Sequence, residues 1–119
     1  NGHERVVELL LQHGAEINKQ ESNGGTALMS AAGNGHERVV ELLIRHGAEI
    51  NLQSSNGYTA LMLAALHGHE RVVELLIRHG AEINLQSSNG YTALMLAAFF
   101  NRPAVVRRLL RAGADAAAR

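Results

Sequence analysis

The stretch that decides the fold is Gly57-Tyr-Thr-Ala-Leu-Met-Leu-Ala-Ala-Leu-His-Gly-His-Glu-Arg-Val-Val-Glu-Leu-Leu-Ile-Arg-His-Gly80. Thr59 is a good N-cap residue because its hydroxyl can accept a hydrogen bond from a free backbone N–H group, so the apolar run after it predicts a short first helix that Gly68 ends. The apolar residues between Val72 and Ile77 predict a second helix. Gly80 ends this helix because glycine tolerates the left-handed conformation. Neither helix buries its apolar face alone, so such units must stack.

This unit is repeated along the chain at a period of about 33 residues. The block that starts at Gly2 recurs from Gly35 and from Gly68, and residues 34–66 and 67–99 differ only at their first and last positions. Between the helix pairs lies an Asn-Gly dipeptide, the strongest short-range hairpin signal. The sequence therefore predicts an all-α repeat solenoid of stacked helix-turn-helix units with β-hairpin turns, about three and a half repeats long.

The motifs of this unit resemble those of the ankyrin-repeat family, and the resemblance covers essentially the whole chain. The family pattern is a β-turn, a Thr-Pro-Leu-His-x-Ala helix, a Gly-His pair and a second helix that ends in Gly-Ala-Asp. The matching segments here are Thr59-Ala-Leu-Met-Leu-Ala-Ala65, Gly68-His69 and Gly80-Ala81-Glu82. The Pro of the family is Ala and its His is Met in every unit, so we expect Met to fill the space of the imidazole by packing. The near-identity of the middle units is typical of a consensus-like or designed member.

The period divides the chain into a single array over residues 1–119. The first repeat lacks its first helix, because the chain begins at a second helix. At the other end, Arg108 stands where Leu75 stands one unit earlier, and we interpret it as a polar substitution that seals the last repeat against solvent. The expected units are a partial first repeat (1–21), two full repeats (22–54 and 55–87) and a C-terminal capping repeat (88–119).

Composition and charge argue against several classes of function. The chain has 11 basic and 11 acidic residues and a formal net charge of zero, which gives no general attraction to nucleic acid or to an anionic membrane. It has no Cys, hence no disulfide framework and no thiolate chemistry. No apolar run approaches the roughly 20 residues that span a bilayer. We expect no nucleic-acid or membrane partner, and an intracellular, cytoplasmic setting.

Nothing in the sequence indicates catalysis, and no cofactor is expected. The Ser residues of the hairpin turns have no Gly-x-Ser-x-Gly elbow, and the only Lys, Lys19, stands in no phosphate-binding loop. The His residues recur once per unit, so stacked copies lie about 10 Å apart, too far to share one Zn²⁺ with ligands at about 2 Å. We therefore predict no metal site and assign the His residues to turns and helix ends.

By resemblance, a partner would bind along the concave surface formed by the hairpin tips and the exposed side of the first helices. All four aromatic residues of the chain fall on this predicted surface, and none lies in an apolar helix stripe. Tyr offers a large, stiff contact area with a polar tip, which suits recognition. The candidate protein-binding residues are Ser22, Asn23, Gly25, Ser55, Asn56, Tyr58, Leu66, His67, Ser88, Asn89, Tyr91, Phe99 and Phe100.

Some of these residues have structural interpretations as well. Tyr58 and Tyr91 could cover their own turns, and Phe99 and Phe100 could pack under the C-terminal cap. The basic residues of the last unit form either a patch for an acidic partner or, as we favour, a solvated face. These residues are Arg102, Arg107, Arg108, Arg111 and Arg119.

The sequence thus predicts a non-catalytic module that binds a protein or peptide partner through its concave face. Two alternatives stay open: a designed or consensus-type scaffold without a dedicated partner, and a regulatory ankyrin fragment of a larger protein. We expect a monomer, or weak self-association through the truncated N-terminal end, where the apolar face of the helix over residues 2–13 has no first helix beside it.

Overall fold

All regular secondary structure in the described part of the chain is α-helical. The computed structural model describes residues 5, 7–9 and 16–114. The helix predicted over residues 2–13 lies mostly outside this part, although residues 5 and 7–9 are helical. The other helices are α2 (Ala27–Gly33), α3 (Glu37–Arg45), α4 (Ala60–Leu66), α5 (Glu70–Arg78), α6 (Ala93–Phe99) and α7 (Pro103–Arg111).

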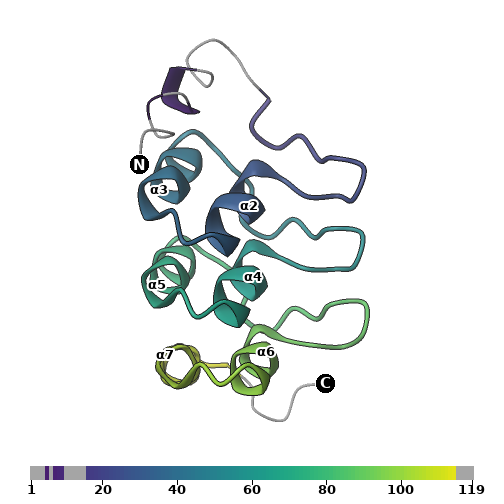
Figure 1. Cartoon of the computed structure of the whole chain (residues 1–119), viewed down its shortest axis with the longest axis vertical. Helices are drawn as coiled ribbons and strands as arrows, with labels where there is room; N and C mark the ends of the chain where they lie inside the picture. The colour runs from purple at the N-terminus through teal and green to yellow at the C-terminus, as the bar shows by residue number, and fades with distance from the viewer. Residues whose placement is uncertain (1–4, 6, 10–15, 115–119) are drawn as a thin grey trace.

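The helices pair and stack in the order of the sequence (Figure 1). Consecutive helices pair as α2–α3, α4–α5 and α6–α7, and the pairs are stacked along the long axis of the molecule, which measures 44 × 26 × 21 Å. The first helices form an inner column and the second helices an outer column. The segment before each first helix projects away from the outer column, so that three loop tips lie in a row. The predicted all-α repeat solenoid is confirmed.

Each first helix begins at a Thr, as the sequence predicts. Thr59 Oγ1 accepts a hydrogen bond from the Met62 backbone N–H at 3.2 Å, and Thr26 and Thr92 cap α2 and α6 in the same way. All three Thr residues are buried. The hydroxyl therefore satisfies a helix-end donor that water does not reach.

Small side chains allow the first helices to pack closely against their neighbours. Ala64 and Ala65 of α4 are 0 % exposed. Met29 and Met62 are 4 % and 1 % exposed, so the prediction that Met fills its position by packing is confirmed. Met95 is only partly buried, because no further unit among the described residues covers α6. The core thus runs through the stack and opens at its C-terminal end.

The loop tips are closed by short hydrogen bonds and contain no strand within the described residues. The Ser54 N–H donates to the Tyr58 carbonyl and the Gly57 N–H to the Ser54 carbonyl, both at 2.8 Å. Tips also bond to each other, since the Ser88 N–H donates to the Asn56 carbonyl at 2.9 Å. Two backbone hydrogen bonds within each tip make a tight hairpin turn, but they are too few to form a β-ladder.

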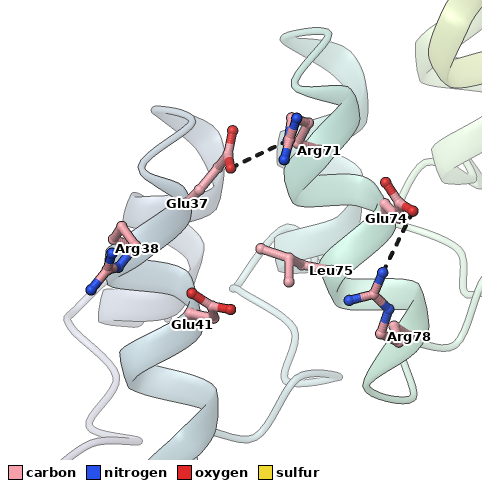
Figure 2. Close-up of a pocket in the computed structure, with 7 residues that line it drawn as sticks. All are labelled: Glu37, Arg38, Glu41, Arg71, Glu74, Leu75 and Arg78. Atoms are coloured by element: carbon pink, nitrogen blue, oxygen red, sulfur yellow. Dashed lines mark ion pairs between the residues drawn. The ribbon is translucent and has the colours of Figure 1, made fainter.

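Among the described residues, the ion pairs lie on the outer column. Arg71 Nε lies 3.5 Å from Glu37 Oε1 and so links α5 to α3, and Arg78 Nη2 lies 3.6 Å from Glu74 Oε2 within α5 (Figure 2). These side chains are 41 % to 80 % exposed. Exposed pairs of this kind contribute about 0–1 kcal/mol each to stability, so they add little to the stability of the stack.

Arg108 does not seal the end of the stack against solvent, which corrects the sequence interpretation. Its Nη2 lies 3.1 Å from Glu70 Oε2, and its Nη1 lies 3.6 Å from Glu74 Oε2. The guanidinium thus faces the preceding unit. Its equivalent in α5, Leu75, also lies in the hollow between units, because this register position points backward along the stack. Leu110, in contrast, is 47 % exposed.

Candidate protein-binding surface

A groove of about 620 Å³ lies between the first two loop tips and the adjoining first helices. Its floor comes from α2 and α4, and its rim comes from the tips that precede them. Polar tip residues and apolar helix residues therefore meet in one hollow. The lining residues are Glu21, Asn23, Gly25, Met29, Ser30, Ser54, Asn56, Tyr58, Leu63 and Leu66.

The groove exists because the first complete unit has small residues where the next unit has large ones. Gly25 stands in place of Tyr58, and Ser30 stands in place of Leu63. Gly33 likewise replaces Leu66, and a Cβ built on it would lie 3.6 Å from the Leu63 Cβ, at ordinary contact distance. The space that large side chains would fill beside α2 is left open, and Leu63 and Leu66 border it.

The structure brings together five of the predicted site residues in this groove and leaves the others around it. The five are Asn23, Gly25, Asn56, Tyr58 and Leu66. Ser22, Ser55, Ser88 and Asn89 are exposed on the loop tips, and His67 is exposed just after α4. Tyr91, Phe99 and Phe100 lie on the third unit, outside the groove.

The three aromatic residues of the last unit are exposed. Tyr91 is 45 %, Phe99 80 % and Phe100 44 % exposed. The two Phe rings contact each other edge to face, with centroids 5.1 Å apart. Phe99 therefore does not pack under a cap among the described residues, which argues against that structural interpretation. Tyr58 has both roles, because it is half-buried and packs against the core while it also lines the groove.

Charge is nearly absent from the lining of the groove. Glu21 is its one charged residue. In contrast, a hollow of about 240 Å³ between α3 and α5 is lined almost entirely by charged side chains, four of which are paired with each other (Figure 2). The groove thus offers apolar contact and amide hydrogen bonding, whereas the outer hollow offers charged side chains, most of which already have partners.

The His and Arg residues near the helix ends serve the joints between units and turns. His69 Nε2 lies 3.0 Å from the Gly33 carbonyl, and Arg102 Nε donates to the Leu66 carbonyl at 2.9 Å. His46 Nδ1 lies 2.9 Å from the Leu42 carbonyl at the end of α3. His3, His13 and Arg119 lie outside the described residues. Within residues 5, 7–9 and 16–114, no three His, Asp or Glu side chains cluster as metal ligands would.

A family model described as ankyrin repeats (3 copies) matches residues 1–87 and 47–119, which together span the chain. The chain belongs to the ankyrin-repeat family. Ankyrin repeats are in general protein–protein interaction modules and a non-catalytic fold. A comparison with curated proteins gave no match. None of the described helices is long and apolar enough to cross a membrane.

Sequence reasoning missed half of the groove in this ankyrin array. Glu21, Met29, Ser30, Ser54 and Leu63 line it but were not predicted as site residues. A signal was present, because Ser30 and Gly33 are small where the next unit has Leu. A small residue in one unit leaves space that the side chains of the next unit border, so these two positions indicate a groove.

Proposed function

We propose that this ankyrin-repeat chain binds a protein or peptide partner along its concave surface, which consists of the groove and the exposed aromatic residues of the third unit. The observation that carries the proposal is the groove, which is open, nearly uncharged and bordered by Tyr58, Leu63 and Leu66. A few anchor residues, often Tyr, supply most of the energy of protein interfaces, and the contacts around them exclude water. Exposed Phe99 would extend the contact beyond the groove.

The distribution of differences between units supports the same surface. Residues 34–66 and 67–99 differ only at the pairs Asn34/His67 and Leu66/Phe99. Both pairs fall where a first helix ends, and Leu66 borders the groove. Residues that differ between otherwise identical units are not needed for the shared fold, so their side chains are free to serve recognition.

The proposal also covers the class of partner, the cellular setting and the oligomeric state. The partner is a protein or peptide, because a neutral chain has no general attraction to nucleic acid. The binding takes place inside the cell, and the chain acts as a monomer or self-associates weakly. The repeat boundaries at residues 21/22, 54/55 and 87/88 divide the surface into one contact segment per unit.

Affinity capture from a cell lysate tests the proposal. The intact chain is compared with a variant that carries Tyr58→Ala, Tyr91→Ala, Phe99→Ala and Phe100→Ala, and with an outer-face control that carries Arg38→Ala and Arg45→Ala. Both Arg residues are exposed and form no ion pair within the described residues. Circular dichroism and urea unfolding establish that all three proteins are folded.

We expect a protein that the intact chain and the outer-face control retain and that the aromatic variant does not. Loss of the same protein from the outer-face control alone would place binding on the second helices and contradict the proposal. Equal retention by all three would contradict the assignment of the aromatic residues.

A second candidate function is a scaffold whose units fold without a dedicated partner. The near-identity of residues 34–66 and 67–99 favours it, because independent drift would separate exposed residues. The absence of any specifically retained protein in the same capture experiment would favour this candidate over the first. A fragment of a larger ankyrin protein is compatible with either function.

A further inference from the structure

The three loop tips carry the same Asn-Gly dipeptide but are restrained by different numbers of hydrogen bonds. Asn23-Gly24, Asn56-Gly57 and Asn89-Gly90 each occupy a tip, and all three Asn residues are exposed. The Gly residues have positive φ angles of 79° to 84°. Asparagine is a thermolabile residue. Its side-chain amide is attacked by the next backbone nitrogen, and a following glycine offers that nitrogen the least steric hindrance.

The first two tips are clamped by the unit that follows them. The Asn23 carbonyl accepts a hydrogen bond from the Ser55 N–H, and the Asn56 carbonyl accepts one from the Ser88 N–H, each at 2.9 Å. No donor reaches the Asn89 carbonyl within the described residues. The third tip therefore lacks the bond that joins each earlier tip to its successor.

A second clamp is missing from the same tip. Gln53 Nε2 donates to the Gly57 carbonyl at 2.9 Å and to the Gln86 carbonyl of the next unit at 3.0 Å. Gln20 makes the equivalent two bonds for the first tip. Gln86 is the same residue at the same position, yet its side chain makes no such bond to the Gly90 carbonyl in the described part of the chain. The Gln side chain is thus fixed across a tip only where a following unit supplies its second acceptor.

The backbone hydrogen bonds within the tip are the same in the second and third units. The Gly57 N–H donates to the Ser54 carbonyl at 2.8 Å, and the Gly90 N–H donates to the Ser87 carbonyl at 2.9 Å. Each bond must open before the glycine nitrogen can act as a nucleophile. The first tip has two further hydrogen bonds: Asn23 Oδ1 accepts one from the Gly25 N–H at 2.8 Å, and the Asn23 carbonyl accepts one from the Ser55 hydroxyl. The three sites therefore differ in how easily the turn opens, not in the chemistry available.

We infer that Asn89 is a site of spontaneous deamidation in the folded chain, and that it reacts faster than Asn56, which in turn reacts faster than Asn23. The Gly90 nitrogen loses its proton to solvent and forms a bond to the Asn89 Cγ. The Cγ–Nδ2 bond breaks and ammonia leaves, which closes a five-membered succinimide. Water then opens the ring at either carbonyl and gives an aspartyl or an isoaspartyl residue. The product places a carboxylate two residues before Tyr91, beside the proposed binding surface.

The chain contains its own control for this inference. Residues 46–66 and 79–99 are identical except at their last position, so Asn56 and Asn89 share the same sequence on both sides. Any difference between their rates in the folded chain must come from the fold. In concentrated denaturant, where the clamps are lost, the two residues should react at the same rate.

The test is a time course of the folded chain in mildly alkaline buffer, followed by trypsin digestion and mass spectrometry. Trypsin gives residues 46–71 and, because the Arg102–Pro103 bond resists cleavage, residues 79–107, so the two sites fall in distinguishable peptides. We expect Asn89 to react at least about fivefold faster than Asn56. This ratio corresponds to a difference of about 1 kcal/mol in the free energy needed to open the two turns. Equal rates in the folded chain, or a faster reaction at Asn56, would overturn the inference.

A matched pair of variants separates the clamp from general stability. Gln53→Ala removes one clamp from the second tip and should raise the rate at Asn56 toward that at Asn89. Gln86→Ala makes the same change at the third tip, where the side chain clamps nothing, and should leave the rate at Asn89 unchanged. If both variants accelerate their own tip equally, the clamp explanation is wrong. This outcome does not depend on whether the concave surface binds a partner.

Discussion

At the scale of single residues, the repeat is defined by a few positions whose chemistry admits few substitutes. Thr59 is buried, and its hydroxyl accepts a hydrogen bond from the Met62 N–H. Ala64 is fully buried, where a larger side chain would hold the neighbouring helices apart. These roles could be predicted from the sequence, because capping and close packing depend on residue type and spacing. The groove could not be predicted in the same way, because it depends on what Gly25 and Ser30 leave unfilled.

Removal of the Thr59 hydroxyl should weaken the middle unit. We expect Thr59→Ala to lower the free energy of unfolding by about 1 kcal/mol, since the Met62 N–H loses its acceptor away from water. Thr59→Ser keeps the hydroxyl and should recover most of this loss. Urea unfolding of the three proteins measures the difference. Equal destabilisation by Ala and Ser would show that the Thr methyl group matters and the cap does not.

At the scale of elements, the helices could be predicted almost residue by residue, whereas the joints between units could not. The pattern around residues 57–80 predicts both α4 and α5, and the structure differs only at their ends. Arg108 was misinterpreted because residue type alone does not tell which side of a helix faces the preceding unit. The clamps formed by Gln53 and Ser88 also escaped prediction, because they join residues of different units through backbone carbonyls.

Two glycines with positive φ angles, Gly57 and Gly80, test how much the contact between adjacent loop tips contributes to stability. A Cβ on Gly57 would lie 2.7 Å from the Ser88 nitrogen of the next tip, whereas a Cβ on Gly80 would meet nothing within 4 Å. We expect Gly80→Ala to lower the free energy of unfolding by about 1–2 kcal/mol through backbone strain alone. Gly57→Ala should lower it by about 1 kcal/mol more, because the bond from Ser88 to Asn56 is also disrupted. Equal losses in urea unfolding would mean that adjacent tips separate at no free-energy cost.

At the scale of the whole molecule, near-identical units make a surface whose character is set by the few places where they differ. The stack places three tips in a row and three first helices beside them (Figure 1). Small residues in the first complete unit open a groove, and large aromatic residues in the last unit project from the same side of the array. The outer column is charged and internally paired. The fold follows from the repeat, and the proposed binding surface follows from the departures from it.

The most direct test of this account fills the groove with the residues of the next unit. Ser30→Leu and Gly33→Leu give α2 the side chains that α4 carries at Leu63 and Leu66, and should leave the fold intact. The measurement is the affinity of this variant for the partner retained by the intact chain, beside that of the outer-face control with Arg38→Ala and Arg45→Ala. We predict that filling the groove weakens binding about tenfold or more, the loss expected when a contact worth about 1.4 kcal/mol is blocked, and that the control binds normally. Unchanged affinity for the groove-filled chain, with folding verified, would contradict it.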